Sequence, residues 1–110
     1  MQTKIDKYGP CLMLHCGGDL VADTVEALGA ELDRHLEAET AEVVLCLEQV
    51  GFIDSRGLEF LLDLRDRLDQ GGRRLALCDL GENLRKIMEI TRLEASFDIM
   101  NDSGEMLKSL

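Results

Sequence analysis

One serine stands where its hydroxyl group could do chemistry. Ser55 lies in the stretch FIDSRGLEF (residues 52–60), between an acidic and a basic residue and directly before an apolar segment with helical spacing. A hydroxyl in such a place can cap a helix, act as a catalytic nucleophile, or accept a phosphate from another protein. Each role needs different neighbours, and the sequence can be searched for them.

The simplest role for Ser55 is that of a helix cap. Serine is among the residues preferred at this position, where its oxygen accepts a hydrogen bond from an N–H group of the first turn. The sequence therefore predicts Ser55 as the N-cap of the helix that follows. The reciprocal partner of a capping box is missing, because the third residue on is Leu58 rather than Glu or Gln. A capping serine remains free for a second role.

A catalytic role for Ser55 has little support. FIDSRG does not match the nucleophile elbow G-x-S-x-G, because no glycine stands two residues before the serine. The only histidines available as a base are His15, inside an apolar run, and His35, near the end of a helical segment. Histidines in such places more often lie at the edge of a core or on the surface. We therefore predict that the protein is not an enzyme, and a small serine hydrolase is the weakest of the functions considered.

Phosphorylation of Ser55 fits its surroundings better. A phosphate would add about −1.5 to −2 charges. It would lie over free N–H groups at the positive end of a helix dipole, which favours an anion. Arg56 could pair with it, whereas Asp54 and Glu59 would repel it. The modification would change the charge and shape of a docking surface without refolding the chain.

The apolar pattern divides the chain into alternating strands and helices that must position this loop. Apolar runs such as EVVLCL, which are typical of strands buried on both faces, and the turn at Gly9-Pro10 delimit the strands. Strands are predicted at residues 4–8, 11–16, 42–47, 74–78 and 96–100. Apolar residues at helical spacing predict helices at residues 21–36, 58–68, 84–91 and 106–110.

This order, ββαβαβαβα, predicts an α/β fold. Strands that alternate with helices form a mostly parallel sheet with right-handed crossovers. We therefore expect a sheet of four to five strands packed against about four helices. Functional groups in such sheets collect beyond the carboxyl ends of the strands. Two loops fall there, Gly17-Gly18-Asp19 and Asp54-Ser55-Arg56-Gly57, and the first lacks the lysine and glycine spacing of a phosphate-binding loop.

Length and charge narrow the classes of function. The 110 residues, of which 45% are apolar, suffice for one small domain, and no linker composition divides them, so we predict a single domain over residues 1–110. A net charge of −10 disfavours nucleic acid and anionic membrane surfaces and suits a protein partner with a basic patch. The first ten residues lack a signal-peptide layout and no apolar run approaches a membrane span, so we expect a cytoplasmic protein.

The cysteines do not indicate a metal site or disulfides. The four cysteines, at positions 11, 16, 46 and 78, form no C-x-x-C pair, and each lies in or beside an apolar run. Cysteine in such a run is usually a small buried hydrophobe. The two histidines stand in no recognisable pattern with them. We therefore predict structural thiols, no metal and no cofactor.

With these features described, the chain resembles the STAS domain of the anti-sigma-factor antagonist family over nearly its whole length. EVVLCLEQVGFIDSRGLEFLL is similar to that family's central block, an apolar strand followed by Asp-Ser-(Ser/Thr)-Gly-Leu. GDLVADTVEAL resembles the Gly-Glu-Leu-Asp entrance to the first helix, and ENLRKIMEITRLEASFDIMNDSGEMLKSL resembles the closing helix, strand and helix.

The resemblance implies a STAS fold and a switch in transcription control. In such proteins the unphosphorylated antagonist binds an anti-sigma factor, often itself a serine kinase, and so frees a sigma factor. The kinase phosphorylates the motif serine, here Ser55, and a serine phosphatase restores it. Carried over by position, the docking face of this chain comprises Asp19, Thr24, Asp54, Arg56, Gly57, Leu58 and Glu59.

Several positions depart from the family pattern. Arg56 replaces the usual second hydroxyl residue, Val21 replaces the acid of Gly-Glu-Leu-Asp, and Glu59 stands where a small residue is common. Arg92, where a glycine often follows the third helix, predicts a differently built helix end. The altered loop motivates an alternative function: an unphosphorylated STAS subunit that docks on a transporter ATPase, as in lipid-transport assemblies.

Overall fold

The two strands predicted on either side of the Gly9-Pro10 turn form a hairpin at one side of the sheet. In the computed structural model, which describes residues 1–100, β1 (Gln2–Tyr8) and β2 (Cys11–Gly17) are antiparallel partners. The turn between them is Gly9-Pro10, and Gly9 has a φ of 60°, in the left-handed region that glycine enters without a steric penalty. Both strands extend slightly beyond their predicted bounds.

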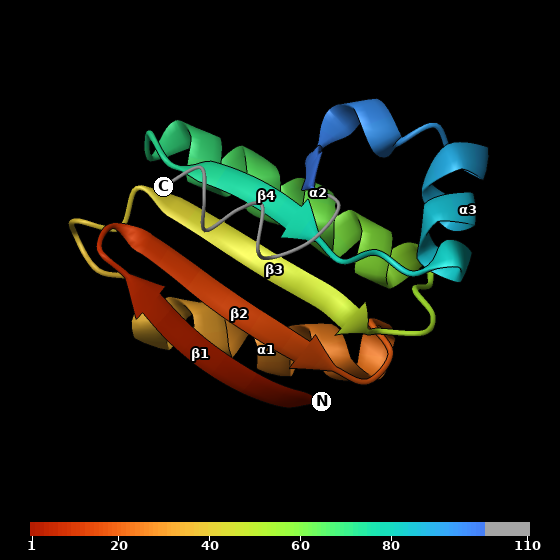
Figure 1. The fold of residues 1–110 in the computed structure, drawn as a ribbon, viewed down its shortest axis with the longest axis horizontal. Coiled ribbons are helices and arrows are strands. Elements are labelled where there is room, and N and C mark those ends of the chain that lie inside the picture. Colours follow the sequence, from red (N-terminus) through yellow and green to blue (C-terminus); the bar gives the residue numbers. More distant parts are fainter. Residues whose placement is uncertain (101–110) are drawn as a thin grey trace.

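The remaining strands add to β2 in chain order and in parallel. β3 (Glu42–Gln49), β4 (Arg74–Cys78) and β5 (Asp98–Met100) complete a five-stranded sheet with the order β1-β2-β3-β4-β5 (Figure 1). Each parallel connection carries a helix, as expected for strands that must cross over to run in the same direction. The carboxyl ends of β2, β3 and β4 therefore share one edge of the sheet.

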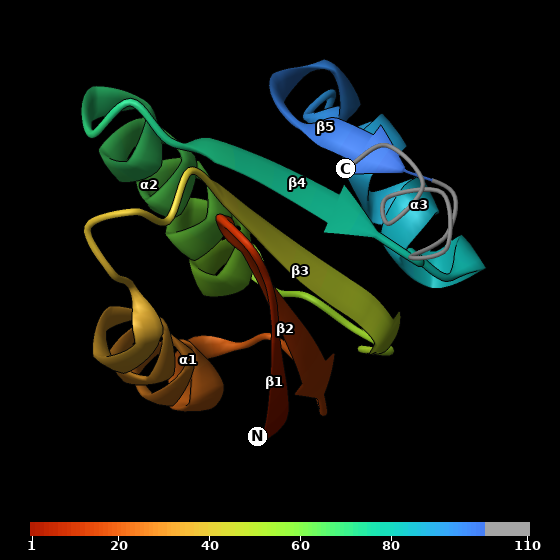
Figure 2. The ribbon, with the colours of Figure 1, turned by 60° about the vertical axis from the view of Figure 1, so that its left-hand side comes forward.

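Two long helices cover one face of the sheet. α1 (Ala22–His35) and α2 (Ser55–Gln70) lie side by side on that face, and α3 (Glu82–Ile90) lies beside β4 and β5 (Figure 2). Leucines from all three helices pack with inward-facing residues of the strands in the main core, among them Leu14, Leu45 and Leu77 of the sheet and Leu28, Leu61 and Leu84 of the helices. The predicted α/β fold with a mostly parallel sheet is confirmed.

The end of the chain differs in part from its prediction. The segment expected as one strand over residues 96–100 begins with a short 3-10 helix, Glu94–Ser96, and only Asp98–Met100 pair with β4. The fourth predicted helix, residues 106–110, lies outside the described part of the chain. No helix within residues 1–100 combines the length and the apolar composition that a membrane crossing requires.

The end of α3 corrects another prediction. Arg92 has a φ of 59°, so it adopts the left-handed conformation that a glycine would take there. Its N–H donates to the Glu89 carbonyl at 3.1 Å, and the next N–H, of Leu93, donates to the Met88 carbonyl at 2.9 Å. These two bonds define an ordinary Schellman cap. The expected departure from the usual geometry is therefore wrong: arginine adopts the same backbone at a steric cost.

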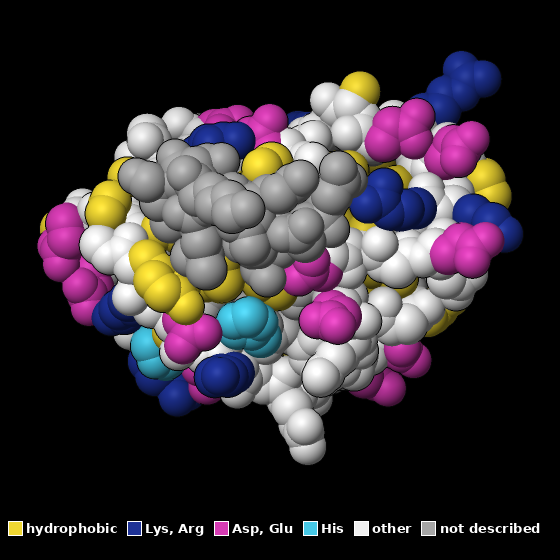
Figure 3. All heavy atoms as spheres, viewed as in Figure 1, with side chains coloured by type: hydrophobic (Ala, Val, Ile, Leu, Met, Phe, Trp, Pro, Cys, Tyr) yellow, Lys and Arg dark blue, Asp and Glu magenta, His cyan; other side chains and the backbone are white. Residues whose placement is uncertain are grey.

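A smaller apolar cluster lies on the sheet face opposite α1 and α2. Its buried members are Cys11, Met13, Val44, Cys46, Ala76 and Cys78. All four cysteines of the chain are buried free thiols, which agrees with the prediction of structural thiols. Figure 3 looks onto this second face, and acidic and basic side chains are intermingled along its visible margin.

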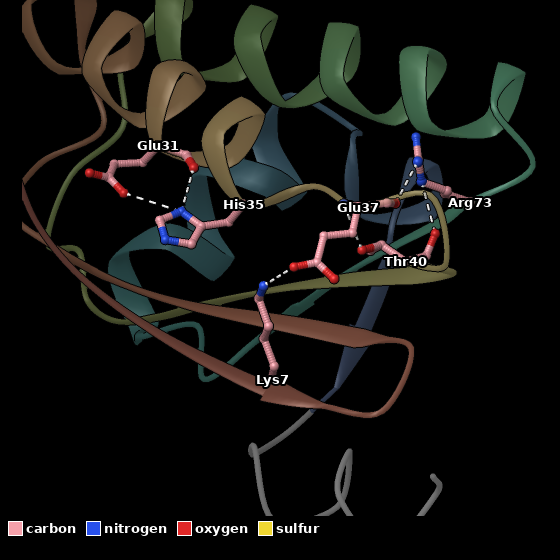
Figure 4. Close-up of polar contacts among 6 residues, drawn as sticks. All are labelled: Lys7, Glu31, His35, Glu37, Thr40 and Arg73. Atoms are coloured by element: carbon pink, nitrogen blue, oxygen red, sulfur yellow. Dashed lines mark hydrogen bonds and ion pairs between the residues drawn. The ribbon is translucent and has the colours of Figure 1, made fainter.

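Hydrogen bonds and an ion pair hold the loop after α1 against the end of the sheet that lies away from Ser55. Arg73 donates from Nε to the Thr40 carbonyl and from Nη2 to the Glu37 carbonyl, both at 2.9 Å. The Glu37 carboxylate also pairs with Lys7 of β1 (Figure 4). The loop after α1 is thus held between the hairpin and the start of β4, far from the opposite edge where the predicted site lies.

Candidate functional site

The loops that follow β2 and β3 are hydrogen-bonded to each other. Leu20 N–H donates to the Phe52 carbonyl at 3.0 Å, and Asp54 N–H donates to the Leu20 carbonyl at 3.2 Å. These bonds continue the parallel pairing of the two strands beyond their ends. The loops therefore form one surface, which we call the Ser55 edge and define as residues 19–24 and 51–59.

Asp54 joins the starts of two helices at this edge. Its Oδ1 accepts from Gly57 N–H at 2.9 Å, and its Oδ2 accepts from Ala22 N–H at 3.2 Å. Asp54 is therefore the N-cap of α2 and also binds the first residue of α1. The prediction that Ser55 is the N-cap is wrong, because the aspartate just before it takes that position and leaves Ser55 as the first helical residue.

The two hydrogen bonds also govern the charge of Asp54. The bond from Gly57 N–H contributes most to lowering the pKa of this carboxyl below its ordinary value of 3.8, and the bond from Ala22 N–H and the nearby Arg56 act in the same direction. Hydrogen bonds and positive charges that favour the ionised form lower a pKa. Asp54 is therefore a carboxylate at neutral pH, fixed beside Ser55 at the positive ends of two helix dipoles.

Gly57 allows the two loops to approach closely. A Cβ atom at this position would lie 2.2 Å from the Leu20 carbonyl oxygen and 2.6 Å from Cγ1 of Ile53. No side chain fits into that space, so α2 can begin directly against the β2–α1 loop only with glycine there. Gly57 thus shapes the loop for a steric reason. It was predicted as part of the docking face, but it is buried and offers no surface to a partner.

Four of the predicted partner-contacting or modified side chains are exposed at the Ser55 edge. They are those of Ser55, Arg56, Glu59 and Asp19. The Gly57 N–H is occupied by the Asp54 carboxylate. A phosphate on Ser55 would therefore lie beside that carboxylate and would not find this N–H group free, contrary to the sequence-based expectation. Repulsion between the two anions would be correspondingly stronger.

Thr24 and Leu58, which were also predicted to contact a partner, are only half-exposed. The Thr24 hydroxyl donates to the Asp19 carbonyl at 2.7 Å and accepts from Val21 N–H at 3.0 Å, so it caps the start of α1. The side chain of Leu58 packs against the main core. Both residues therefore stabilise the Ser55 edge through contacts within the protein.

The structure adds two residues that the sequence prediction missed. Phe52 keeps 46% of its surface exposed, directly beside the predicted loop. Asn83, at the start of α3, donates from Nδ2 to the Gly51 carbonyl at 3.0 Å. An aromatic residue two positions before Asp54 is a signal that the sequence did offer. The contact from Asn83 follows only from the tertiary arrangement and extends the edge to α3.

The two histidines are engaged away from Ser55. His15 Nε2 lies 3.1 Å from Asp6 Oδ2, across the β1–β2 hairpin. His35 Nδ1 lies 3.0 Å from the Glu31 carbonyl oxygen, in the last turn of α1. The start of α1 lies at the Ser55 edge, and a 14-residue helix is about 20 Å long, so His35 is remote from the serine. His15 is the register partner of Cys46 and so projects from the sheet face opposite α2, whose first residue is Ser55. Neither histidine is therefore placed to act as a base for Ser55.

Comparison with known proteins adds independent information. The sequence profile of the STAS domain matches residues 2–106. The protein named "Putative anti-sigma factor antagonist BtrV" from Bordetella bronchiseptica is 30% identical over 101 residues, which are 92% of this chain and 87% of that protein. The anti-sigma F factor antagonist of Paenibacillus polymyxa is 22% identical over 111 residues, 100% of this chain and 95% of that protein.

Solved structures share the fold at lower identity. The unphosphorylated form of the anti-sigma factor antagonist SpoIIAA superposes with a TM-score of 0.73 at 16% identity, covering 98% of this chain and 96% of that chain. The phosphorylated form of SpoIIAA, a Bacillus cell fate determinant, gives the same TM-score at 15% identity, covering 99% and 100% of the two chains. At such identities the likeness establishes the fold alone.

Proposed function

Because this chain belongs to the STAS domain family, we propose that it is an anti-sigma factor antagonist that is switched by phosphorylation of Ser55. The unmodified protein binds an anti-sigma factor that is also a serine kinase, and this binding frees a sigma factor for transcription. The kinase transfers phosphate to Ser55 and a serine phosphatase removes it. The protein itself is a substrate and a binding partner, with no catalytic step of its own.

The observation that carries this proposal is the placement of Ser55. Its side chain is exposed at the first residue of α2, inside the Asp-Ser-x-Gly motif. The backbone beneath it is fixed by the Asp54 cap and by the close contact of Gly57 with Leu20. A kinase would meet a serine that is accessible on a rigid edge, and a docking partner would meet a surface that does not need to reorganise.

Phosphorylation would act on docking through local charge and shape. A phosphate adds about −1.5 to −2 charges, directly beside the Asp54 carboxylate and on the same exposed edge as Glu59. Arg56 is the nearest cation in sequence and would compensate only part of that charge. A partner surface complementary to the hydroxyl would then face a bulky dianion, so binding weakens without any change in the fold.

The first experiment tests the modification. The protein is incubated with ATP and the serine-kinase anti-sigma factor encoded in the same organism, and phosphorylation is mapped by mass spectrometry. Wild type should gain one phosphate on Ser55, and Ser55→Ala should gain none. Ser96→Ala is the matched control, because it removes a serine in the described chain outside the Ser55 edge. Phosphate at another residue, or none from a kinase that binds the protein, would contradict the proposal.

The second experiment tests docking. Wild type, Ser55→Ala and Ser55→Asp are used as baits for affinity capture, and the proposal requires that an anti-sigma factor binds the first two and is lost with Ser55→Asp. A specific observation keeps one alternative in view, since the exposed Arg56 replaces the second hydroxyl residue of the motif. Capture of transporter ATPase subunits by all three baits, without a kinase, would favour the unphosphorylated STAS subunit instead.

A further inference from the structure

Two cysteines far apart in the sequence meet on the second face of the sheet. Cys46 of β3 and Cys78 of β4 are register partners on adjacent parallel strands. Their Sγ atoms lie 3.0 Å apart, and both residues are buried in the smaller apolar cluster. Two sulfur atoms in ordinary van der Waals contact lie about 3.6 Å apart. The distance between these two Sγ atoms is shorter than that.

The backbone already satisfies the geometry that a disulfide needs. Neighbouring strands lie about 4.8 Å apart, and bridged cysteines have Cα atoms about 4.4–6.8 Å apart. Register partners project to the same side of a parallel sheet, so the two Cβ atoms point in a common direction. The S–S bond of a disulfide is about 2.05 Å long, so the two sulfur atoms must approach each other by about 1 Å. Rotation of the side chains can supply this movement without a change of strand pairing.

We propose that Cys46 and Cys78 form a reversible disulfide when the protein is exposed to a peroxide. The Sγ of Cys78 donates its proton in a hydrogen bond to the Sγ of Cys46, so we assign Cys46, the acceptor sulfur, as the attacking group after it has released its own proton. It attacks one peroxide oxygen: an S–O bond forms, the O–O bond breaks, and the departing hydroxide takes up the proton released by Cys46. The products are a sulfenic acid on Cys46 and one water.

The second step closes the bridge. The sulfur of Cys78 attacks the sulfur of the sulfenic acid, an S–S bond forms and the S–O bond breaks. The hydroxide that leaves takes up the proton of Cys78 and becomes the second water. Two thiols and one peroxide thus give one disulfide and two waters, with the thiols oxidised by two electrons and the peroxide reduced by two.

The environments of the thiols support this division of roles. The hydrogen bond to Cys46 contributes most to raising the pKa of Cys78, and burial contributes next. Cys78 therefore holds its proton and acts second. Burial also makes the reaction slow, because little thiolate is present and the oxidant must penetrate. We therefore expect a pair that responds to sustained peroxide and not to a brief pulse.

Among the hydrogen bonds of the described chain, neither of the other two cysteines contacts a second thiol, although an electrostatic interaction with Cys78 adds to the effect of burial on the raised pKa of Cys16. Cys11 lies at the start of β2, where its Sγ is 3.9 Å from the Glu42 carboxylate, and burial raises its pKa to about 11. Cys16 packs in the main core on the opposite face of the sheet, and burial raises its pKa to about 12. Both serve as internal controls for selectivity.

The bridge would enclose residues 51–59, the part of the Ser55 edge that follows β3. The chain between Cys46 and Cys78 contains the end of β3, the Ser55 loop and all of α2. A disulfide that closes such a loop restricts the unfolded chain and stabilises the fold. Oxidised protein should therefore unfold at a higher temperature than reduced protein, and the difference should vanish after treatment with dithiothreitol.

The test uses the full chain and hydrogen peroxide. After incubation, free thiols are alkylated and peptides are mapped without reduction. Wild type and Cys11→Ser should both yield a linked pair of peptides containing Cys46 and Cys78, two hydrogens lighter than their sum, which dithiothreitol separates. Cys78→Ser should instead trap a sulfenic acid on Cys46, detected with dimedone. If that variant does not fold, the wild-type map and its melting temperature remain decisive.

Three outcomes would overturn the inference. One is a linked pair that involves Cys11 or Cys16 in place of Cys46 and Cys78. Another is a full set of alkylated thiols at peroxide concentrations that oxidise glutathione in the same tube. The third concerns metal, since Cys46, Cys78 and Asp79 have ligand atoms within 4.8 Å of one another. If the wild-type protein retains one equivalent of Zn²⁺ and its thiols resist peroxide, and if Cys46→Ser abolishes the zinc binding, the two cysteines would be assigned to metal binding.

Discussion

Two residues of the motif around Ser55 act mainly on the architecture of the edge. Asp54 binds N–H groups at the starts of α1 and α2, and Gly57 lets α2 begin in contact with the Leu20 carbonyl. Ser55 itself contributes an exposed hydroxyl and leaves the capping to its neighbour. The motif therefore combines one exposed hydroxyl group, which we propose as the site of phosphorylation, with two residues that fix the backbone around it.

The steric role of Gly57 leads to a prediction about stability. Gly57→Ala should lower the free energy of unfolding by about 2–3 kcal/mol, because the new methyl group overlaps the Leu20 carbonyl oxygen and forces α2 away. Urea denaturation followed by circular dichroism measures this change. Gly29→Ala is the matched control, since Gly29 also lies in a helix but its Cβ would be 3.4 Å from Phe60, an ordinary contact.

The control should move in the opposite direction. Alanine is favoured over glycine inside a helix by about 0.5–1 kcal/mol, so Gly29→Ala should be neutral or stabilising. Equal losses in the two variants would mean that helix glycines matter here for a reason other than the close approach to Leu20.

Asp54 leads to a prediction about pH. The pKa of Asp54 in the folded state lies below its ordinary 3.8, so the contribution of its carboxylate to stability is complete above that value. It is lost as the pH falls through the lowered pKa, where the folded state also takes up the proton. Asp54→Asn should therefore be less stable than wild type at pH 7, and the difference should shrink below about pH 4, near the ordinary aspartate pKa.

Urea denaturation of both proteins at several pH values measures this difference. Asp23→Asn is a suitable control, because Asp23 is an exposed acid in the first turn of α1. It should show a smaller difference from wild type. A difference between wild type and Asp54→Asn that stays constant down to pH 3 would contradict the assigned role of the carboxylate.

At the scale of secondary structure elements, the site depends on how element ends are joined. The loops after β2 and β3 pair through Leu20, and Asn83 of α3 binds the Gly51 carbonyl. Three connections of the sheet thereby meet at one edge. The starts of α1 and α2 are both bound by the Asp54 carboxylate, whereas the end of α3 carries a residue poorly suited to its conformation.

That helix end predicts a stabilising substitution. Arg92 adopts a φ of 59° in a Schellman cap, a conformation in which a side chain is penalised and glycine is not. Arg92→Gly should raise the free energy of unfolding by about 0.5–1 kcal/mol, the net effect after the greater freedom of glycine in the unfolded chain is counted. Thermal and urea unfolding measure the change.

Arg92→Ala separates conformation from charge. Alanine removes the guanidinium group and keeps the penalised side chain, so its stability should stay close to that of wild type. A gain as large as that of Arg92→Gly would show that the charge of Arg92, and not its backbone conformation, was unfavourable.

At the scale of the whole molecule, the main core connects α1, α2 and α3, the α-helices within residues 1–100, to the sheet. Leucines of α1, α2 and α3 belong to one buried cluster with residues of β2, β3 and β4. Such a shared core couples the parts of the chain in unfolding. The organisation as a single domain remains a prediction from the sequence, and this continuity gives it a physical basis.

We therefore predict a single cooperative unfolding transition. Far-ultraviolet circular dichroism reports on the backbone, and the fluorescence of Tyr8, the one tyrosine of a chain without tryptophan, reports on the hairpin. The two should give the same melting temperature, and the calorimetric and van't Hoff enthalpies should agree. Two results would show that the chain contains more than one cooperative unit. One is a hairpin that melts at a different temperature from the rest, and the other is a calorimetric enthalpy well above the van't Hoff enthalpy.

The sequence by itself determined the α/β class and the order of the described elements, and it singled out the Ser55 loop as the candidate site. Apolar periodicity and turn residues are local properties, and right-handed crossovers leave few ways to assemble them. The motif residues Asp54, Ser55 and Gly57 were therefore visible before the fold was known. The assignment of the cap to Ser55 failed because two adjacent residues with similar capping preference compete, and only the actual chain path selects one.

The tertiary structure decided everything that depends on two distant segments meeting. Asp54 reaches the start of α1, Gly57 faces Leu20, and Asn83 closes on Gly51 only because parallel strands bring their carboxyl ends to one edge. The same register places Cys46 against Cys78, although 32 positions separate them and no spacing rule connects them. Sequence patterns report the preferences of a segment, whereas contacts across strands follow from register, which the packed sheet alone sets.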